Sequence, residues 1–227
     1  MDWTLLRRVF GLLVFAFSIA ALVWGYWPLP VQARSLEISP AEMLPAELPA
    51  GQDPDRLVAI AEPRTLSLEW PSQVRAGDSA AIRMIYALVA PQVPKVRVFT
   101  IPADAYSILL VSRLELPRIP HTPLGEVSQA LLPGRPLTFM WDLRPITAGE
   151  ANGTVWLHLR LIPPAGDPEL RKFLSDQRIQ VQVIDFFGLT GPWARALGSA
   201  GMVVGAAFGL DGIARWLWQR WATKPGV

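Results

Sequence analysis

The sequence contains no cysteine and only two histidines, His121 and His158, among 227 residues. Without cysteine the protein can have no disulfide, thiol nucleophile, iron–sulfur cluster or cysteine-ligated zinc. Two histidines nearly exclude a multi-histidine metal site as well, and neither has an obvious second ligand close to it in the sequence. We therefore expect the protein to hold no metal and no cofactor.

Charged residues are scarce. They make up 18% of the chain, against 51% hydrophobic residues, and the mean hydropathy is +0.28. This composition is too apolar for an ordinary soluble protein, so part of the chain is expected to lie in lipid. The formal net charge is only +2, which provides no polyanion-binding surface. Nucleic acid is therefore not an expected partner.

Catalytic motifs are missing too. The sequence shows no nucleophile elbow, no phosphate-binding glycine loop, no zincin histidine pair and no closely spaced carboxylates. Carboxylates such as Asp142 and Glu150 could meet in space, and an extracytoplasmic hydrolase that acts through loop carboxylates is a remote alternative. We expect a protein that is not an enzyme.

The first long apolar run, Val9–Trp27, contains no charged residue. As a helix these 19 residues would reach roughly 28 Å, close to the hydrocarbon thickness of a bilayer. Trp24 and Trp27 near its end are typical of a membrane interface, and Pro28 would stop the helix. Residues 1–33 are thus predicted to form an N-terminal transmembrane helix.

A cleaved signal peptide is the alternative for this segment. A basic pair, Arg7 and Arg8, precedes the apolar run, and Val31-Gln32-Ala33 resembles a cleavage site. The apolar core is longer than the usual 7–15 residues of a signal peptide, which favours a retained anchor. The two arginines would remain in the cytoplasm.

Residues 34–63 hold five prolines, and six acidic residues against two basic ones. Prolines recurring every few residues prevent a long helix, and the acidic composition disfavours a packed core. This segment is predicted to be an extended, semi-rigid linker.

From Pro63 onward, apolar residues alternate with polar ones, which is the period of a half-buried strand. The alternating segments are residues 65–70, 137–144, 154–161 and 179–183, and residues 80–89, 96–100 and 107–116 add three more candidates. Asn152-Gly153 is interpreted as a turn between two strands, and residues 167–177 as a short helix or a long loop. Residues 64–185 are therefore predicted to form an antiparallel β-sandwich.

The last apolar segment, within residues 186–221, is predicted to be a second transmembrane helix, with residues 222–227 as a cytoplasmic tail. An interfacial amphipathic helix is the alternative. Gly201, Gly205 and Gly209 recur every four residues, so one helix face would allow another backbone to approach closely. The partner could be the first helix, a second copy of the chain or a foreign subunit.

Seven of the ten tryptophans flank the two apolar segments. Indole favours the headgroup layer, so we assign a membrane-interface role to five of them: Trp24, Trp27, Trp193, Trp216 and Trp218. Asp211 and Arg215 lie one helical turn apart near the end of the second segment and are expected to form an intrahelical ion pair. Basic residues beyond both helices place both termini in the cytoplasm.

Two sequence passages share a cadence of strand, tryptophan and turn: Leu68-Glu69-Trp70-Pro71 before Gly77-Asp78-Ser79, and Trp141-Asp142-Leu143-Arg144-Pro145 before Ala148-Gly149. In this cadence residues 64–185 resemble bacterial membrane-anchored immunoglobulin-like ectodomains, a loose group mostly without assigned chemistry. The resemblance implies an immunoglobulin-like fold outside the cytoplasm, with Trp70 or Trp141 as core tryptophan. The resemblance identifies no functional residue in this sequence.

Together these features predict a mainly β protein, an immunoglobulin-like antiparallel β-sandwich flanked by an N-terminal and a C-terminal transmembrane helix. The expected function is a non-enzymatic module that binds or scaffolds proteins outside the cytoplasm. The alternative is an accessory subunit of a larger membrane complex that docks through the Gly201/Gly205/Gly209 face. Expected partners are the lipid bilayer and either another protein or a second copy bound through the helices.

Overall fold

The computed structural model describes residues 3–38, 63–88, 107–132, 134–163 and 169–209. These residues are mainly β, in two five-stranded sheets, with an apolar helix near the N-terminus. They divide into two compact units, which we describe separately. The helical unit contains the described parts of residues 1–28, 75–78 and 184–227, and the β unit those of residues 29–74 and 79–183.

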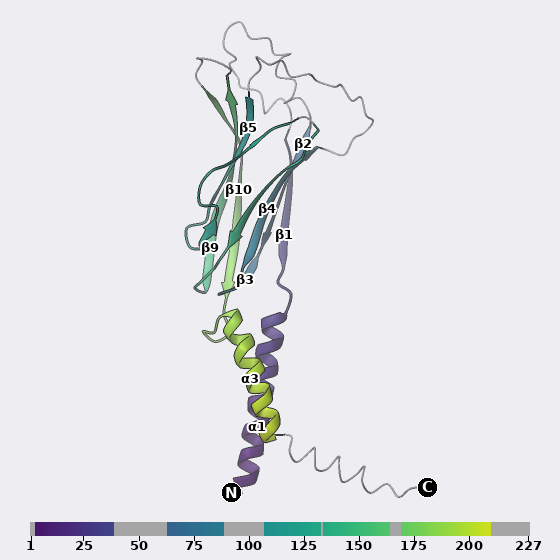
Figure 1. Cartoon of the computed structure of the whole chain (residues 1–227), viewed down its shortest axis with the longest axis vertical. Coiled ribbons are helices and arrows are strands. Elements are labelled where there is room, and N and C mark those ends of the chain that lie inside the picture. The colour runs from purple at the N-terminus through teal and green to yellow at the C-terminus, as the bar shows by residue number, and fades with distance from the viewer. Residues whose placement is uncertain (1–2, 39–62, 89–106, 133, 164–168, 210–227) are drawn as a thin grey trace, which may run out of the picture. The chain divides into compact units, whose positions relative to one another are not determined.

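Each sheet of the β unit is antiparallel in the strand pairs that the structure defines. In the first sheet the strand order is β1 (Val31–Ile38), β2 (Arg64–Pro71), β4 (Ala80–Leu88), β8 (Leu137–Leu143) and β6 (His121–Thr122). In the second it is β3 (Gln73–Arg75), β10 (Leu170–Ile184), β9 (Gly149–Ile162), β5 (Ser107–Glu115) and β7 (Val127–Ala130). Figure 1 shows β5, β9 and β10 on one side of the unit and β1, β2 and β4 on the other.

The core lies between these two sheets. The buried hydroxyl of Ser112 on β5 lies 4.0 Å from the sulfur of Met84 on β4, which is a direct contact from one sheet to the other. The alternation predicted from the sequence is confirmed, because its apolar positions are buried on all four strands: Leu66, Leu68 and Trp70; Leu137, Phe139, Trp141 and Leu143; Val155, Leu157, Leu159 and Leu161; Ile179, Val181 and Val183. Trp70 and Trp141 are thus both core residues.

A buried cation sits at one end of this core. Arg64 starts β2 and is almost wholly buried; it donates hydrogen bonds to the carbonyl oxygens of Arg135 (2.8 Å) and Leu132 (3.0 Å). Its guanidinium carbon also lies 5.4 Å from the ring centre of Tyr86. Burial raises the pKa of the Tyr86 phenol to about 12, and the positive charge of Arg64 opposes that rise. The guanidinium is tolerated in the core because carbonyls and a ring face surround it.

The turn predicted at Asn152-Gly153 is wrong, because both residues lie inside β9. A Cβ atom at Gly153 would lie 2.5 Å from the carbonyl oxygen of Glu115 and 2.7 Å from Cδ1 of Leu116. Close approach of the neighbouring chain therefore explains this glycine, not a turn conformation.

Two further expectations need correction. Residues 167–177 are neither a helix nor wholly a loop, because β10 begins at Leu170 and pairs with β9 across a register shift between Phe173 and Ser175. The bulge at Leu174 interrupts the alternation that would have revealed this strand. Residues 34–38 of the expected linker belong to β1, whose pattern is hidden because seven of its eight side chains are exposed. The rest of that linker, and the expected strand 96–100, lie outside the described residues.

The helical unit contains α1 (Trp3–Tyr26) and α3 (Gly191–Gly209). Among the described residues, one segment is long and apolar enough to cross a membrane, Leu5–Tyr26, so α1 could be a membrane span or a signal anchor. The described part of α3 is 19 residues long. Asp211, Arg215, Trp216 and Trp218 and the expected tail 222–227 lie outside the described residues.

Replacing Gly153 by alanine should destabilise the β unit by about 1–3 kcal/mol, because the added methyl group meets backbone that cannot move aside easily. Gly125→Ala is the matched control, since a Cβ atom there has no neighbour within 4 Å. It should change the stability by less than about 0.5 kcal/mol. Unfolding of the full chain in detergent, followed by tryptophan fluorescence, measures both; equal effects would contradict the crowding at Gly153.

Candidate functional site

The two helices of the helical unit lie side by side (Figure 1), and small residues form their interface. Among the described side chains of α1 and α3, every buried residue is glycine, alanine or serine: Gly11, Ser18, Ala21 and Gly25 on α1, and Gly191, Ala194, Gly198 and Gly205 on α3. These residues recur at intervals of three, four or seven, so they form one stripe on each helix. The helices pack through these stripes nearly backbone to backbone.

The glycine face predicted from the sequence lies in this interface. A Cβ atom at Gly201 would lie 2.3 Å from the Ser18 hydroxyl oxygen, and one at Gly205 would lie 2.6 Å from the backbone nitrogen of Phe15. Of the three possible partners, the structure therefore places the first helix against Gly201 and Gly205. Gly209 is the last described residue of α3.

Large apolar side chains point away from this interface. Leu13 on α1 is 64% exposed and Val203 on α3 is 71% exposed. Phe10, Phe17, Leu197 and Phe208 are also exposed. In water the large side chains would be buried and the small ones left outside, so this pattern is the reverse of a soluble helix pair. It suits lipid, where small residues promote contact between helices and large apolar residues face acyl chains.

Two arginines bind the carboxyl-terminal end of α1. Arg75 donates hydrogen bonds to the carbonyl oxygen of Trp24 at 2.9 Å and to that of Trp27. Arg195 on α3 donates to the carbonyl oxygen of Gly25 at 3.1 Å. The last carbonyls of a helix have no partner within the helix, and positive charge is favourable at this end of its dipole. The arginines therefore supply both hydrogen bonds and charge where α1 needs them.

Asp78 completes this group, which we call the arginine clamp (Arg75, Asp78 and Arg195). Its carboxylate binds Arg195 through two hydrogen bonds of 2.6 and 3.0 Å. A Cβ atom on Gly191 would lie 2.7 Å from the same carboxylate, so Asp78 also lies against the amino-terminal end of α3, where negative charge is favourable. Burial is the main cause that lowers the pKa of Arg75, and Asp78 opposes that shift. The arginine clamp thus joins the end of α1 to the start of α3.

The aromatic residues predicted at a membrane interface gather around this clamp. The guanidinium carbon of Arg75 lies 5.1 Å from the ring centre of Trp24, and that of Arg195 lies 5.7 Å from the ring centre of Tyr26. Trp27 and Trp193 are exposed. Trp24, Trp27 and Trp193 therefore lie at one end of the helix pair, and their role at a membrane interface stays a prediction.

The β unit carries a second candidate site, on the outer face of β9 and β10. The ring of Phe173 lies 6.1 Å from that of Trp156 and 5.7 Å from that of His158, centre to centre, with edge-to-face geometry. Phe173 is 50% exposed although it sits on a strand. Burial, followed by the charge of Arg171, lowers the pKa of His158 below its ordinary value. We call Trp156, His158 and Phe173 the aromatic patch.

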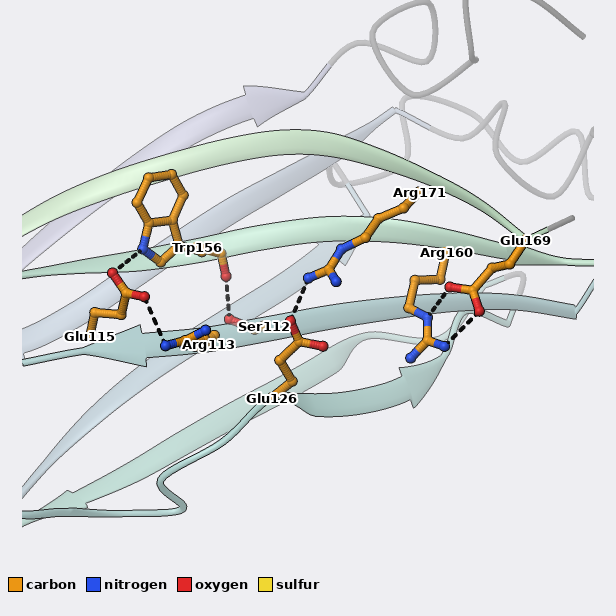
Figure 2. A network of polar contacts seen from close by, with 8 residues as sticks. All are labelled: Ser112, Arg113, Glu115, Glu126, Trp156, Arg160, Glu169 and Arg171. Atoms are coloured by element: carbon orange, nitrogen blue, oxygen red, sulfur yellow. Dashed lines mark hydrogen bonds and ion pairs between the residues drawn. The ribbon is translucent and has the colours of Figure 1, made fainter.

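Several ion pairs lie on or beside the strands that carry the aromatic patch, and Figure 2 shows them together with Trp156. Glu115 accepts a hydrogen bond from the Trp156 indole at 3.0 Å and pairs with Arg113 at 3.0 Å. Arg171 bridges to Glu126, and this hydrogen bond lowers the pKa of the Glu126 carboxyl group. Arg160 binds both carboxylate oxygens of Glu169. The result is an apolar centre with a fixed polar rim, which is the composition of a protein-binding surface.

A groove of about 510 Å³ lies elsewhere on the β unit. Arg34 and Trp70 line it from β1 and β2, with the Arg34 guanidinium carbon 6.0 Å from the Trp70 ring centre. Arg178, Asn152 and Gln180 line it from β9 and β10, and none of its described lining residues is acidic. The groove could therefore take an anionic or hydrogen-bonding group.

Sequence reasoning missed both the arginine clamp and the aromatic patch. Asp78 was interpreted only as part of a turn. Phe173 fell in the segment interpreted as a helix or loop. The position of Trp156 and His158 among the polar residues of an alternating strand was the available signal for the aromatic patch, because large aromatic residues on the polar face of a strand need an explanation.

No grouping of three potential metal ligands occurs among the described residues. The Nδ1 atom of His121 lies 3.1 Å from the carbonyl oxygen of Ile119. The ring of His158 packs against that of Phe173. The two histidines are thus parts of separate local contacts in the described structure.

No protein-family model and no curated protein matches this chain. Among solved structures, it is similar to the complex of zinc 2-glycoprotein and prolactin inducible protein from human seminal plasma, with a TM-score of 0.31 and 13% identity over 51% of this chain and 89% of that chain. It is also similar to Escherichia coli alpha-2-macroglobulin, with a TM-score of 0.31 and 12% identity over 54% of this chain and 8% of that chain. A PapD-like domain of human CEP192 gives a TM-score of 0.27 and 8% identity over 51% of this chain and 81% of that chain. Similarities this low assign neither a family nor a function.

Substituting Gly205→Leu should separate the helices, because the new side chain would meet the backbone of Phe15. We expect the helical unit to lose about 1–3 kcal/mol of stability, the usual cost of overpacking. Ala207→Leu is the matched control, since Ala207 is exposed on the same helix. Thermal unfolding in detergent compares the two variants, and an equal loss in both would argue against the small-residue interface.

Proposed function

We propose that this chain is a two-pass membrane protein whose immunoglobulin-like β-sandwich lies outside the cytoplasm and binds or scaffolds a protein partner without catalysis. The observation that carries the proposal is the reversed packing of α1 and α3, with small residues between the helices and large apolar residues exposed. That pattern is stable only where the surrounding solvent is itself apolar.

The second span would extend α3 beyond its described end. The described part, Gly191–Gly209, is short for a bilayer, but the sequence continues to Trp218 with mostly apolar residues, in which only Asp211 and Arg215 are charged. Antiparallel packing of Gly205 against Phe15 and of Arg195 against Gly25 is what two consecutive spans require. Arg7 and Arg8 near the start of α1, and Arg215, Arg220 and Lys224 beyond the described end of α3, favour cytoplasmic termini.

The aromatic patch is the part of the β unit that best fits partner binding. Its three rings are held in place by edge-to-face contacts and by the Glu115 hydrogen bond, so binding would order few side chains. Tryptophan and arginine are also the residues that most often dominate binding at interfaces. The surrounding charges are already paired and would form a polar rim.

Docking through the glycine face is the alternative, as an accessory subunit of a larger complex. Gly201 and Gly205 contact α1 within the same chain, so a foreign helix would have to displace α1 to use them. We therefore prefer the β unit as the binding part and the helix pair as its anchor.

Single cysteines test the topology cleanly, because the native chain has none. Ser128→Cys, at an exposed position of β7, should react with an impermeant maleimide in intact cells. Thr223→Cys should react only after the membrane is permeabilised. The reverse pattern, or equal labelling of both in intact cells, would overturn the proposed orientation and with it the extracytoplasmic function.

Site-specific photo-crosslinking tests the binding surface. With p-benzoylphenylalanine in place of Phe173, irradiation of the native cells should give an adduct of discrete mass. Leu124 is the matched control, an apolar residue of the β unit that is 78% exposed and outside the aromatic patch. Adducts from both positions alike, or from neither, would contradict specific binding at the aromatic patch.

A further inference from the structure

A tight turn in the helical unit places two phenylalanines against α1. The backbone nitrogen and oxygen of Phe186 are each hydrogen-bonded to Leu189, at 3.0 Å in both cases, and Phe187 and Gly188 form the tip. The ring of Phe186 lies 5.3 Å from that of Trp24 and 5.5 Å from that of Phe17. The turn therefore lies along the side of the helix.

These ring contacts also give the direction in which the turn extends. Phe17 precedes Trp24 by two helical turns, which is roughly 10 Å along the helix axis. The ring of Phe187 lies 6.5 Å from that of Phe17, so the tip of the turn is directed from the Trp24 level toward the middle of α1. In a spanning α1, this is the direction from the interface into the acyl chains.

The conformation and exposure of Phe187 call for an explanation. Its φ angle is 52°, a left-handed conformation that costs free energy in any residue with a Cβ atom and that glycine or asparagine would adopt more readily. Its side chain is nevertheless 85% exposed, so the helical unit recovers little of that cost by packing. A residue that is both strained and unburied points to a surrounding phase that the chain alone does not supply.

We propose that the turn Phe186–Leu189 inserts Phe187 into the acyl-chain boundary of the bilayer beside α1, as a membrane contact separate from the two helices. The inference rests on the proposed function, since it requires α1 to lie in lipid. The lipid boundary fits because the ring is continuous with the apolar surface of Phe17 and Trp24. The turn also fits because Phe186 and Leu189 satisfy each other's backbone groups, as a segment leaving water must.

The test uses the full chain in phosphatidylcholine and phosphatidylglycerol vesicles, with one environment-sensitive NBD label per molecule. The labelled variants are Phe187→Cys, Leu13→Cys on the exposed face of α1, and Leu124→Cys on the β unit. Thermal unfolding checks that each variant folds like the cysteine-free parent; the 85% exposure of Phe187 means that its replacement removes little packing. Emission is then measured with doxyl-labelled lipid, which quenches within the bilayer, and with iodide, which quenches from water.

We expect the label at position 187 to lose emission with doxyl lipid and to resist iodide, as position 13 does, while position 124 responds to iodide alone. If position 13 is quenched by lipid but position 187 by iodide, the inference is overturned and the proposed anchor stands. Shielding of position 187 from both quenchers would mean that protein covers the turn, which also overturns it. If position 13 itself is not quenched by lipid, the proposed function fails first.

Discussion

The last carbonyl groups of α1 need hydrogen-bond donors from outside the helix, and the helical unit is built around supplying them. These carbonyl groups have no partner within the helix, and at the membrane position that we propose water would not reliably supply one. Arg75 and Arg195 bond those carbonyls, and a hydrogen bond from a charged donor contributes about 1.5–3 kcal/mol. Because the arginines come from the end of β3 and from α3, the same contacts that end α1 also bring together three segments distant in sequence. Asp78 balances the two positive charges and lies at the start of α3.

This clamp and the small-residue interface depend on each other. Arg195 reaches the carbonyl of Gly25 only if α3 starts close to α1, and its side chain would clash with any Cβ atom at position 25. Glycine, alanine and serine on α1, and glycine and alanine on α3, provide that closeness over further turns. In lipid, where we propose that the pair lies, no hydrophobic force acts between helices, so close packing and polar contacts at the ends must hold the pair. The small-residue interface supplies the close packing, and the arginine clamp supplies the polar contacts at the end of the helices.

The sequence predicted the core of the β unit well and its edges poorly. Alternation at Leu66, Phe139, Leu157 and Val181 marks strands with one buried face, because burial on one side imposes a period of two. β1 has no buried face over most of its length, and the bulge in β10 shifts the period, so both escaped prediction. Asn152-Gly153 misled for a different reason: the glycine serves a close approach from Glu115, which is a tertiary contact that no local pattern records.

The functional features show the same division. A glycine repeat on one helix face predicts close packing, since that property belongs to a single element, and α1 proved to be the neighbour of Gly201 and Gly205. The arginine clamp needs Arg75, Asp78 and Arg195 together, and their separation in sequence leaves no local signal. The aromatic patch likewise depends on pairing Phe173 with His158 across two strands. Phe173 is 50% exposed on β10, beside the partly buried Trp156 and His158 of β9, and this exposed aromatic ring near satisfied ion pairs is the feature that supports the proposed binding surface.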